Sequence, residues 1–180
     1  TRPRFFRITN ITDKSFTVSF LTKVPVESQL ILLDSKEERL IADSGDSTKR
    51  IHFFIVDNLE PEREYQFYLV NQGKRHPRQK RRYYFQKTAA PPKEAPAPPV
   101  NIYGRVVNEE KKNQSDVLVY LTSPEKPSLS VITDVNGGFL FDIRGIADEF
   151  SLTAISPQFQ IGTVAFSQPP QNEIEIVLGR

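Results

Sequence analysis

A proline-rich segment in the middle of the chain limits most strongly what this sequence can fold into. It runs Thr88-Ala-Ala-Pro-Pro-Lys-Glu-Ala-Pro-Ala-Pro-Pro99, so five of its twelve residues are proline and its other apolar residues are alanine. Such a segment cannot build a core or a helix, and it favours extended polyproline II structure as a semi-rigid spacer. We therefore predict two domains, residues 1–88 and 99–180, with a linker over residues 89–98 rather than a mere surface loop.

Both halves of the chain show the residue pattern of short β-strands. Phe16, Val18 and Phe20 alternate with polar residues, as on a strand with one face in a core. No stretch keeps a helical period, so we expect almost no helix. The strands are expected at residues 5–10, 15–20, 29–33, 39–42, 51–56, 64–70 and 82–87, and then at 100–107, 117–122, 128–133, 138–143, 150–155, 162–166 and 173–178. The predicted fold class is all-β, with two tandem antiparallel β-sandwich domains.

The composition argues against catalysis. The 180 residues include no cysteine and only two histidines, His52 and His76, so a thiol nucleophile, a disulfide framework and a histidine-rich metal centre are excluded. Neither histidine lies near a Gly-x-Ser-x-Gly turn. Paired acidic residues flank turns and are expected to be solvated; they are Glu37, Glu38, Asp43 and Asp46. We therefore expect no enzyme activity, no metal site and no cofactor.

One motif in the first half carries a family resemblance. Leu59-Glu-Pro61-Glu-Arg-Glu-Tyr65 has the spacing of leucine, proline and tyrosine that leads into strand F of a known sandwich, and residues 15–20 match its strand B with Phe20 where a tryptophan is usual. Residues 3–88 therefore resemble a fibronectin type III domain. The resemblance implies an immunoglobulin-like sandwich in which the Tyr65 hydroxyl turns back to the backbone as a tyrosine corner.

Three other motifs, Ile102-Tyr-Gly104-Arg-Val106, Val117-Leu-Val-Tyr-Leu121 and Thr133-Asp-Val-Asn-Gly-Gly-Phe139, carry a second resemblance. Through them residues 99–178 resemble a carboxypeptidase regulatory-like domain, which is a transthyretin-like sandwich. Such domains accompany secreted peptidases, outer-membrane receptors and surface proteins, usually without catalysis of their own.

This second resemblance has two departures from the family pattern. Ser115-Asp116 stands where Gly-Ala is usual, and Glu149-Phe150 stands where a late Gly-Tyr is usual. The turn at residues 134–137 is expected to be a tight hairpin, because Asn136 and Gly137 can supply two positive φ angles.

The charge of the two halves differs in sign. Residues 1–90 hold 17 Lys and Arg against 11 Asp and Glu, a net +6, whereas residues 91–180 hold 7 against 11, a net −4. Six permanent cations fall within nine residues of the loop expected between strands F and G. Such a cluster favours a polyanion, for example a sulfated or phosphorylated glycan, or an acidic neighbour, although a solvated hairpin tip is the alternative. The candidate polyanion-binding residues are Lys74, Arg75, Arg78, Lys80, Arg81 and Arg82.

The aromatic residues that follow this cluster bear on nucleic acids. Tyr83 and Phe85 are expected to face the core, and base stacking needs exposed rings, so we expect no sequence-specific nucleic-acid binding. No apolar run is long enough to cross a membrane, so no membrane insertion by these residues is expected.

The predicted function is a non-catalytic, extracellular module pair. It would serve as a stalk, adhesion or scaffold segment of a larger cell-surface protein, with a protein or glycan partner and with any anchor or export signal outside the given chain. Two alternatives stay open: an accessory region that targets a secreted hydrolase to its substrate or to the wall, and a subunit of a surface filament that pairs through exposed edge strands.

Overall fold

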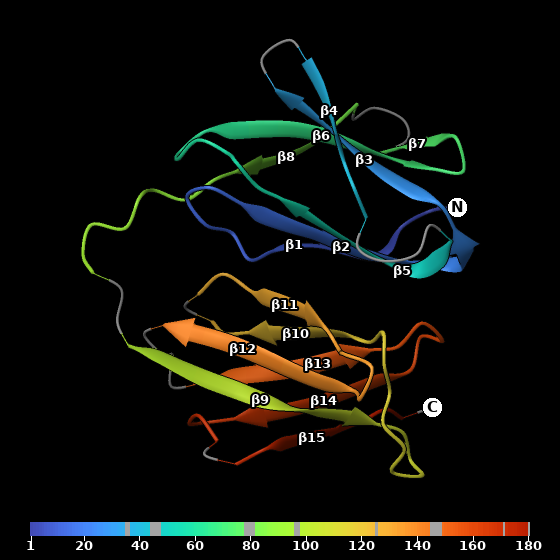
Figure 1. Ribbon diagram of the computed structural model, residues 1–180, viewed down its shortest axis with the longest axis vertical. Helices are drawn as coiled ribbons and strands as arrows, with labels where there is room; N and C mark the ends of the chain where they lie inside the picture. The colour runs from blue at the N-terminus through green and yellow to red at the C-terminus, as the bar shows by residue number, and fades with distance from the viewer. Residues whose placement is uncertain are drawn as a thin grey trace. The chain divides into compact units, whose positions relative to one another are not determined.

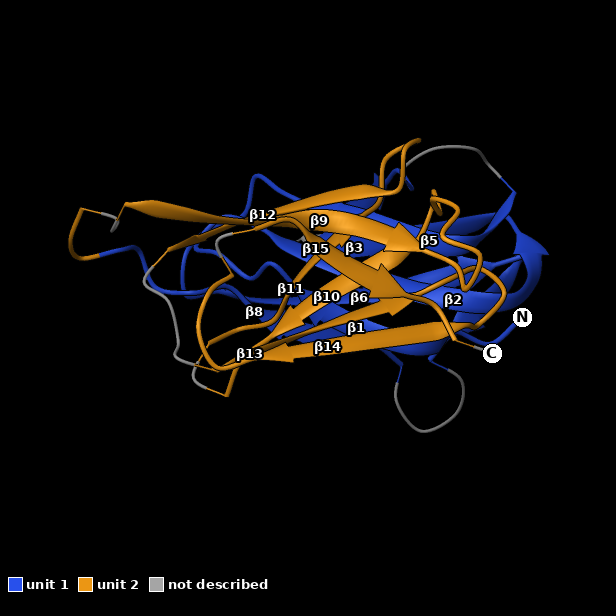
Figure 2. Cartoon of the chain, turned by 90° about the horizontal axis from the view of Figure 1, so that it is seen from below, with its two compact units in different colours: residues 1–92 blue, residues 93–180 orange. Residues whose placement is uncertain are grey.

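The computed structural model describes residues 1–34, 37–43, 48–77, 82–95, 98–124, 126–144, 149–170 and 172–179. Within these ranges the secondary structure consists of strands and turns, which confirms the predicted all-β class. No helix in the described residues is long and apolar enough to cross a membrane. The chain forms two compact units, unit 1 (residues 1–92) and unit 2 (residues 93–180), shown in Figures 1 and 2.

Unit 1 is a sandwich of two antiparallel sheets. Its strands are β1 (Arg4–Thr9), β2 (Phe16–Val26), β3 (Ser28–Asp34), β4 (Glu37–Ile41), β5 (Lys49–Val56), β6 (Glu64–Asn71), β7 (Lys74–His76) and β8 (Tyr84–Lys87). One sheet has the order β1-β2-β5, and the other has the order β4-β3-β6-β7, with β8 also paired to β6. The predicted inward face of β2 is confirmed, because Phe16, Val18 and Phe20 have no exposed surface and pack with Phe54 and Phe67.

The tyrosine corner expected in unit 1 is present. The backbone N–H of Glu60 donates to the Tyr65 hydroxyl at 2.8 Å. Tyr65 is buried in the core with Leu59, and its hydroxyl accepts a backbone hydrogen bond, as the polar end of a buried tyrosine usually does. The corner fixes the start of β6 against the turn that precedes it.

The start of the proline-rich segment still belongs to unit 1. The Thr88 hydroxyl donates to the Glu60 carbonyl at 2.6 Å, and the Ala89 N–H donates to the Thr12 carbonyl at 2.8 Å. Composition alone does not reveal these bonds, because they depend on backbone partners far away in the sequence. At the other end, Pro99 is already the first residue of a strand in unit 2.

Strand β7 was not expected from the sequence. It pairs with the end of β6, where Val70 lies opposite Arg75. Gln72 and Gly73 both have positive φ angles, 49° and 70°, as a two-residue type I′ hairpin requires. The basic residues of β7 hide it from a hydrophobicity pattern, because its pairing is set by the turn and not by an apolar face.

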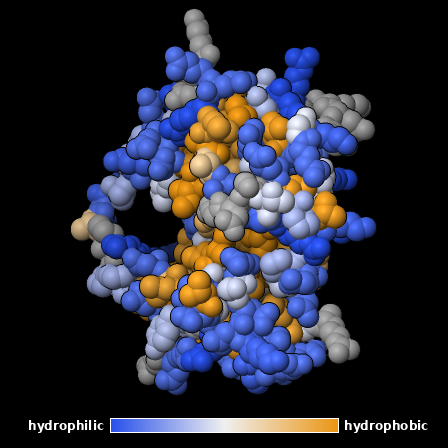
Figure 3. Space-filling view, turned by 45° about the vertical axis from the view of Figure 1, so that its right-hand side comes forward, coloured by the Kyte–Doolittle hydropathy of each residue, from blue (hydrophilic) through white to orange (hydrophobic). Residues whose placement is uncertain are grey.

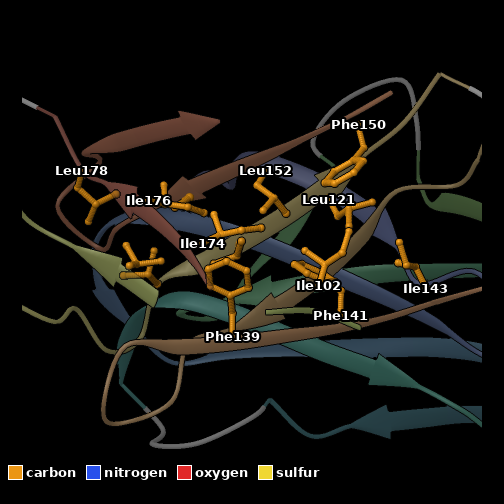
Figure 4. Packing of buried hydrophobic residues seen from close by; sticks show 14 residues of the cluster. Ile102, Leu121, Phe139, Phe141, Ile143, Phe150, Leu152, Ile174, Ile176 and Leu178 are labelled. Carbon is orange, nitrogen blue, oxygen red and sulfur yellow. The ribbon is translucent and has the colours of Figure 1, made fainter. Parts of the chain in front are cut away.

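Unit 2 is a second sandwich. Its strands are β9 (Pro99–Val107), β10 (Leu118–Thr122), β11 (Leu129–Ile132), β12 (Gly138–Arg144), β13 (Phe150–Ile155), β14 (Ile161–Phe166) and β15 (Ile174–Val177). The sheets have the orders β11-β10-β13-β14 and β12-β9-β15. Figure 4 shows the core between them, where Phe139 and Phe141 lie among aliphatic side chains of both sheets. Ile174 and Ile176 point inward, as their alternation with glutamates predicts.

Two details of unit 2 differ from the expectation. Strand β15 pairs with β9 in parallel, whereas every other strand pair in the described residues is antiparallel. The turn at residues 134–137 is not a hairpin, because β11 and β12 belong to different sheets. Only Gly137 has a positive φ in this turn, and the Asp134 carboxylate accepts the N–H groups of Asn136 and Gly138, each at 2.8 Å. The turn is therefore stabilised by the Asp134 side chain, and not by a second positive φ angle at Asn136.

Candidate binding surface

The structure places three of the six predicted polyanion-binding residues. Lys74 and Arg75 lie on β7 and Arg82 lies just before β8, all three with exposed side chains. The other three, Arg78, Lys80 and Arg81, lie outside the described residues. Since β7 and β8 both pair with β6, the described cations gather along one edge of the five-stranded sheet of unit 1.

Arg75 is held on an aromatic base. The centre of its guanidinium lies 3.8 Å from the ring centroid of Tyr68 and 4.8 Å from that of Tyr83. Its Nη2 also donates to the Arg82 carbonyl at 3.2 Å. Cation–π contacts at exposed sites contribute about 0.5–1 kcal/mol each, so this side chain is ordered on the sheet while its charge stays available.

Tyr68 links this cation to the opposite edge of the sheet. Its hydroxyl donates to Glu38 Oε1 at 3.1 Å. Partial burial, followed by the hydrogen bond and the negative charge of Glu38, raises the pKa of Tyr68 above its ordinary value, while the charge of Arg75 acts in the opposite direction. A connected row therefore runs across β4, β6 and β7: Glu38, Tyr68, Arg75 and Tyr83.

The expectation that Tyr83 and Phe85 face the core is wrong. Tyr84 faces the core, where its ring stacks on Phe6 at 4.4 Å between centroids. Phe85 is 50% exposed, and the Tyr83 ring lies 6.4 Å from that of Tyr68 on the solvent side. Three consecutive aromatic residues do not reveal which of them points inward, and the pairing of Tyr84 with Phe67 decides it.

Apolar side chains cover the solvent side of this sheet. Leu40 lies opposite Ile31, and Ile31 lies opposite Tyr68, so one row crosses three strands. Leu40 is 60% exposed, although the solvent face of an antiparallel sheet is normally polar. We call this surface the outer face of unit 1; its apolar, aromatic and cationic residues are Ile31, Leu33, Leu40, Tyr68, Val70, Arg75, Tyr83 and Phe85. The same registers place the polar residues Gln29, Glu38 and Gln66 on this face. Figure 3 shows hydrophobic side chains at the surface of the molecule among hydrophilic ones.

A second polar arrangement in unit 1 was also missed. His52 Nδ1 lies 2.7 Å from Asp43 Oδ2, and His52 Nε2 lies 3.3 Å from the Thr22 hydroxyl. Asp43 also accepts the Phe53 N–H at 2.9 Å and pairs with Lys49 at 3.1 Å. Asp43 was expected to be solvated, but its side chain is only 9% exposed. No local pattern predicts this contact, because Asp43 follows a strand of one sheet and His52 lies on a strand of the other. Asp46 lies outside the described residues.

The hydroxyl, imidazole and carboxylate of this network stand in the order of a catalytic triad, but their environment is that of a core. Thr22 and His52 have no exposed surface, and the Thr22 hydroxyl donates to the Val24 carbonyl at 2.9 Å. The network therefore ties β2 and β5 to Asp43, which lies two residues after the end of β4. Among the described residues, no group of three or more metal-binding side chains comes together.

No protein-family model matches the sequence, and no curated protein matches it. Among solved structures, the FN1–FN3 domains of chicken CNTN1 align over 98% of this chain and 65% of theirs, with 16% identity and a TM-score of 0.35. A two-domain fibronectin type III segment of chicken tenascin aligns over 92% of this chain and 97% of its own, with 12% identity and a TM-score of 0.32. The Bacillus anthracis TIE protein aligns over 97% of this chain and 40% of its own, with 9% identity and a TM-score of 0.34.

The chain thus spans less than two thirds of the CNTN1 and TIE structures, and likenesses at these TM-scores assign no function to it. The fold of each unit follows from its own strands. In unit 1 the three-stranded and five-stranded sheets and the tyrosine corner at Tyr65 form a fibronectin type III-like sandwich.

Proposed function

We propose that this chain is a non-catalytic module pair that serves as a stalk, adhesion or scaffold segment of a larger cell-surface protein. The observation that carries the proposal is that each unit closes a hydrophobic core of its own between two sheets, on either side of a proline-rich segment. Sandwich modules with separate cores can be strung together without sharing buried surface, as a stalk requires. The proposal includes the carboxypeptidase regulatory-like character of unit 2, which the motifs around Gly104 and Gly137 support.

The binding role within this proposal belongs to unit 1. Its basic edge is the β7–β8 side of the sheet, with the described cations Lys74, Arg75 and Arg82. The sequence holds six cations from Lys74 to Arg82 and no acidic residue between Tyr65 and Glu94. Without a nearby carboxylate on this stretch, the positive charge stays available for a partner. The seating of Arg75 on two tyrosine rings keeps one of these cations in a fixed position. These features support a sulfated or phosphorylated glycan as the ligand.

Chromatography on immobilised heparin tests this role. We expect the whole chain to be retained at low salt and its affinity to fall about tenfold to a thousandfold between roughly 50 and 200 mM salt, because each contacted anion releases counterions. Retention should be lost when Arg78, Lys80, Arg81 and Arg82 are replaced by serine. A thermal melt of this variant should stay near that of the parent, because exposed charges contribute little to stability.

The matched control removes four cations from unit 2 instead: Lys111, Lys112, Lys126 and Arg144, each replaced by serine. This variant has the same net charge as the first, so a difference in elution reports the position of the charges. If the two variants elute together, or if the parent passes through the column, the binding role of the basic edge is wrong.

A further inference from the structure

The outer face of unit 1 has charge of opposite sign at its two edges. The β4 edge carries the exposed Glu37 and Glu38 together with Arg39, whose Nη2 donates to the Asp57 carbonyl at 2.6 Å, so its net charge is negative. Glu38 lies on the outer face, where it accepts the Tyr68 hydroxyl. The opposite edge carries cations on and beside β7 and β8, namely Lys74, Arg75, Arg82 and Lys87. Between the edges lie the apolar side chains of Leu40, Ile31 and Leu33, and Gln66 separates Leu33 from Phe85. The face is therefore polarised, with an apolar middle.

The composition of the middle is that of a protein interface. Interface centres are enriched in tyrosine, phenylalanine and arginine and depleted of lysine and acidic residues. Substituting alanine for tyrosine or arginine at such centres is among the changes that weaken binding most. Side chains that are already ordered in the free protein lose less conformational entropy on association. The outer face has these residue types in Tyr68, Arg75 and Tyr83. They are also ordered, because the two tyrosine rings already hold the Arg75 guanidinium.

The two edges decide which partner fits. An acidic protein or a polyanion that covered the whole face would be repelled by Glu37 and Glu38, and a polyanion would leave Leu40 and Ile31 uncovered. A second copy of the chain has complementary charge when a two-fold axis runs parallel to the strands. That rotation lays the cationic edge of each copy over the acidic edge of the other and brings the apolar middles together.

We propose that the chain self-associates through the outer face of unit 1 as a two-fold symmetric, face-to-face dimer. Four strands about 4.8 Å apart, each contributing about five residues with a rise of about 3.3 Å, give a face of roughly 300 Å² in projection. Counted over both copies this is roughly 600 Å², below the about 1,200 Å² at which standard specific interfaces begin, so the dimer is weak and depends on concentration. This association goes beyond the proposed function and requires no polyanion.

Sedimentation equilibrium of the whole chain tests the dimer. At low salt, over about 10 µM to 1 mM, we expect a monomer–dimer equilibrium with a Kd on the order of 100 µM. The double variant Leu40→Ser and Phe85→Ser should dimerise at least about tenfold more weakly, because both exposed side chains lie in the interface. The control is Val135→Ser with Leu140→Ser, which removes two exposed apolar side chains from unit 2 and should leave the Kd unchanged.

Reversing the edge charges tests the two-fold arrangement. Glu37→Lys with Glu38→Lys should weaken the dimer about tenfold at low salt, since cations would then face cations. Adding Lys74→Glu, Arg82→Glu and Lys87→Glu to the same chain should restore it, because the opposite edge then carries three glutamates and only Arg75 as a described cation, so the edges are complementary again. A circular dichroism melt of each variant shows that unit 1 is folded.

Three results would overturn the dimer: a monomeric parent at every concentration, equal dissociation constants for the Leu40/Phe85 variant and its control, and no recovery after the full charge exchange. A monomeric chain that still binds heparin would overturn the dimer alone and leave the proposed function standing. A chain that dimerises but passes through the heparin column would overturn the binding role of the basic edge and leave the dimer standing.

Discussion

Arg75 of unit 1 and the paired cations of unit 2 are held in different ways. In unit 2 the Arg105 guanidinium donates to both carboxylate oxygens of Glu173, at 3.0 and 2.6 Å, and Lys111 pairs with Glu175. In unit 1 Arg75 rests on two tyrosine rings, in a stretch of sequence without a carboxylate, although Lys49 elsewhere in unit 1 pairs with Asp43. The charge of the unit 2 pairs is therefore neutralised locally, and the charge of Arg75 is not.

The consequence is chemical. The hydrogen bond and charge of Arg105 lower the pKa of Glu173, and Glu173 in turn raises the pKa of Arg105, so both groups are satisfied by each other. A cation over a ring keeps its net charge, and a guanidinium presents five N–H donors, which suit carboxylates, sulfates and phosphates. The same β-architecture thus holds Arg105 of unit 2 in a neutralised pair and holds Arg75 of unit 1 over aromatic rings that leave its charge in place.

The largest expected effect is a substitution that unfolds unit 2 and leaves unit 1 folded. In β9, a Cβ on Gly104 would collide with the Ile174 carbonyl oxygen and lie 2.8 Å from a Phe139 ring carbon. Gly104→Val should therefore cost unit 2 more than about 5 kcal/mol, which is the whole stability of many small domains. Amide NMR spectra should lose the signals of unit 2 and keep those of unit 1. The control is Gly179→Ala, which should be tolerated because the nearest atom to the new Cβ is 3.7 Å away. If Gly104→Val removed the amide signals of both units, their cores would not be separate.

A substitution in the buried network of Asp43 and His52 should destabilise unit 1 and leave unit 2 unchanged. Asp43→Ala leaves His52, Lys49 and the Phe53 N–H without their acceptor, so we expect a loss of about 3–5 kcal/mol in the unfolding free energy of unit 1. Glu175→Ala breaks the exposed ion pair of unit 2 and should barely move its denaturation midpoint. Denaturant titrations of both variants make the comparison. Equal shifts would show that Asp43 is no more important than a surface carboxylate.

Removing a single hydroxyl gives a smaller effect. Tyr65→Phe removes the acceptor of the part-buried hydrogen bond from the Glu60 N–H, and we expect unit 1 to lose about 1–3 kcal/mol. Tyr103→Phe in unit 2, where the side chain is 45% exposed, is the matched substitution and should be silent. An unchanged urea midpoint for Tyr65→Phe would contradict the tyrosine corner.

The smallest expected effect is a shift in the pKa of Tyr68, which lies between Glu38 and Arg75 on the outer face. Glu38→Gln should lower the pKa of Tyr68, because a negative neighbour is removed, and Arg75→Gln should raise it, because a positive neighbour is removed. Carbon-13 NMR of the tyrosine ring carbons during a titration to high pH measures both shifts. If both substitutions moved this pKa in one direction, the row would not be arranged as described.

Sequence predicts this fold well where the signal is local. The alternation of Phe16, Val18 and Phe20 predicts the buried face of β2, and the spacing from Leu59 to Tyr65 predicts the corner. Strand existence depends mainly on such alternation within a few residues, so the expected strands all appear in the structure.

What the sequence could not predict depends on register between distant strands. The cations of the candidate site are visible in the sequence, but their aromatic partner Tyr68 is not, because its side of the sheet follows from its pairing with Ile31. The contact between His52 and Asp43 depends likewise on how β4 leads into β5. The parallel pairing of β15 with β9 is set by topology and carries no residue pattern of its own.

A titration of the whole chain with a short heparin oligosaccharide, followed by amide NMR at low salt, tests most directly whether unit 1 holds the binding surface. The amide signals of Lys74, Arg75, Arg82 and Tyr83 should shift, and they should return when salt is added, because the contacts are ionic. The signals of Lys111 and Lys112 in unit 2 should stay in place. Equal shifts in both units, or shifts confined to unit 2, would contradict the assignment of binding to the basic edge of unit 1.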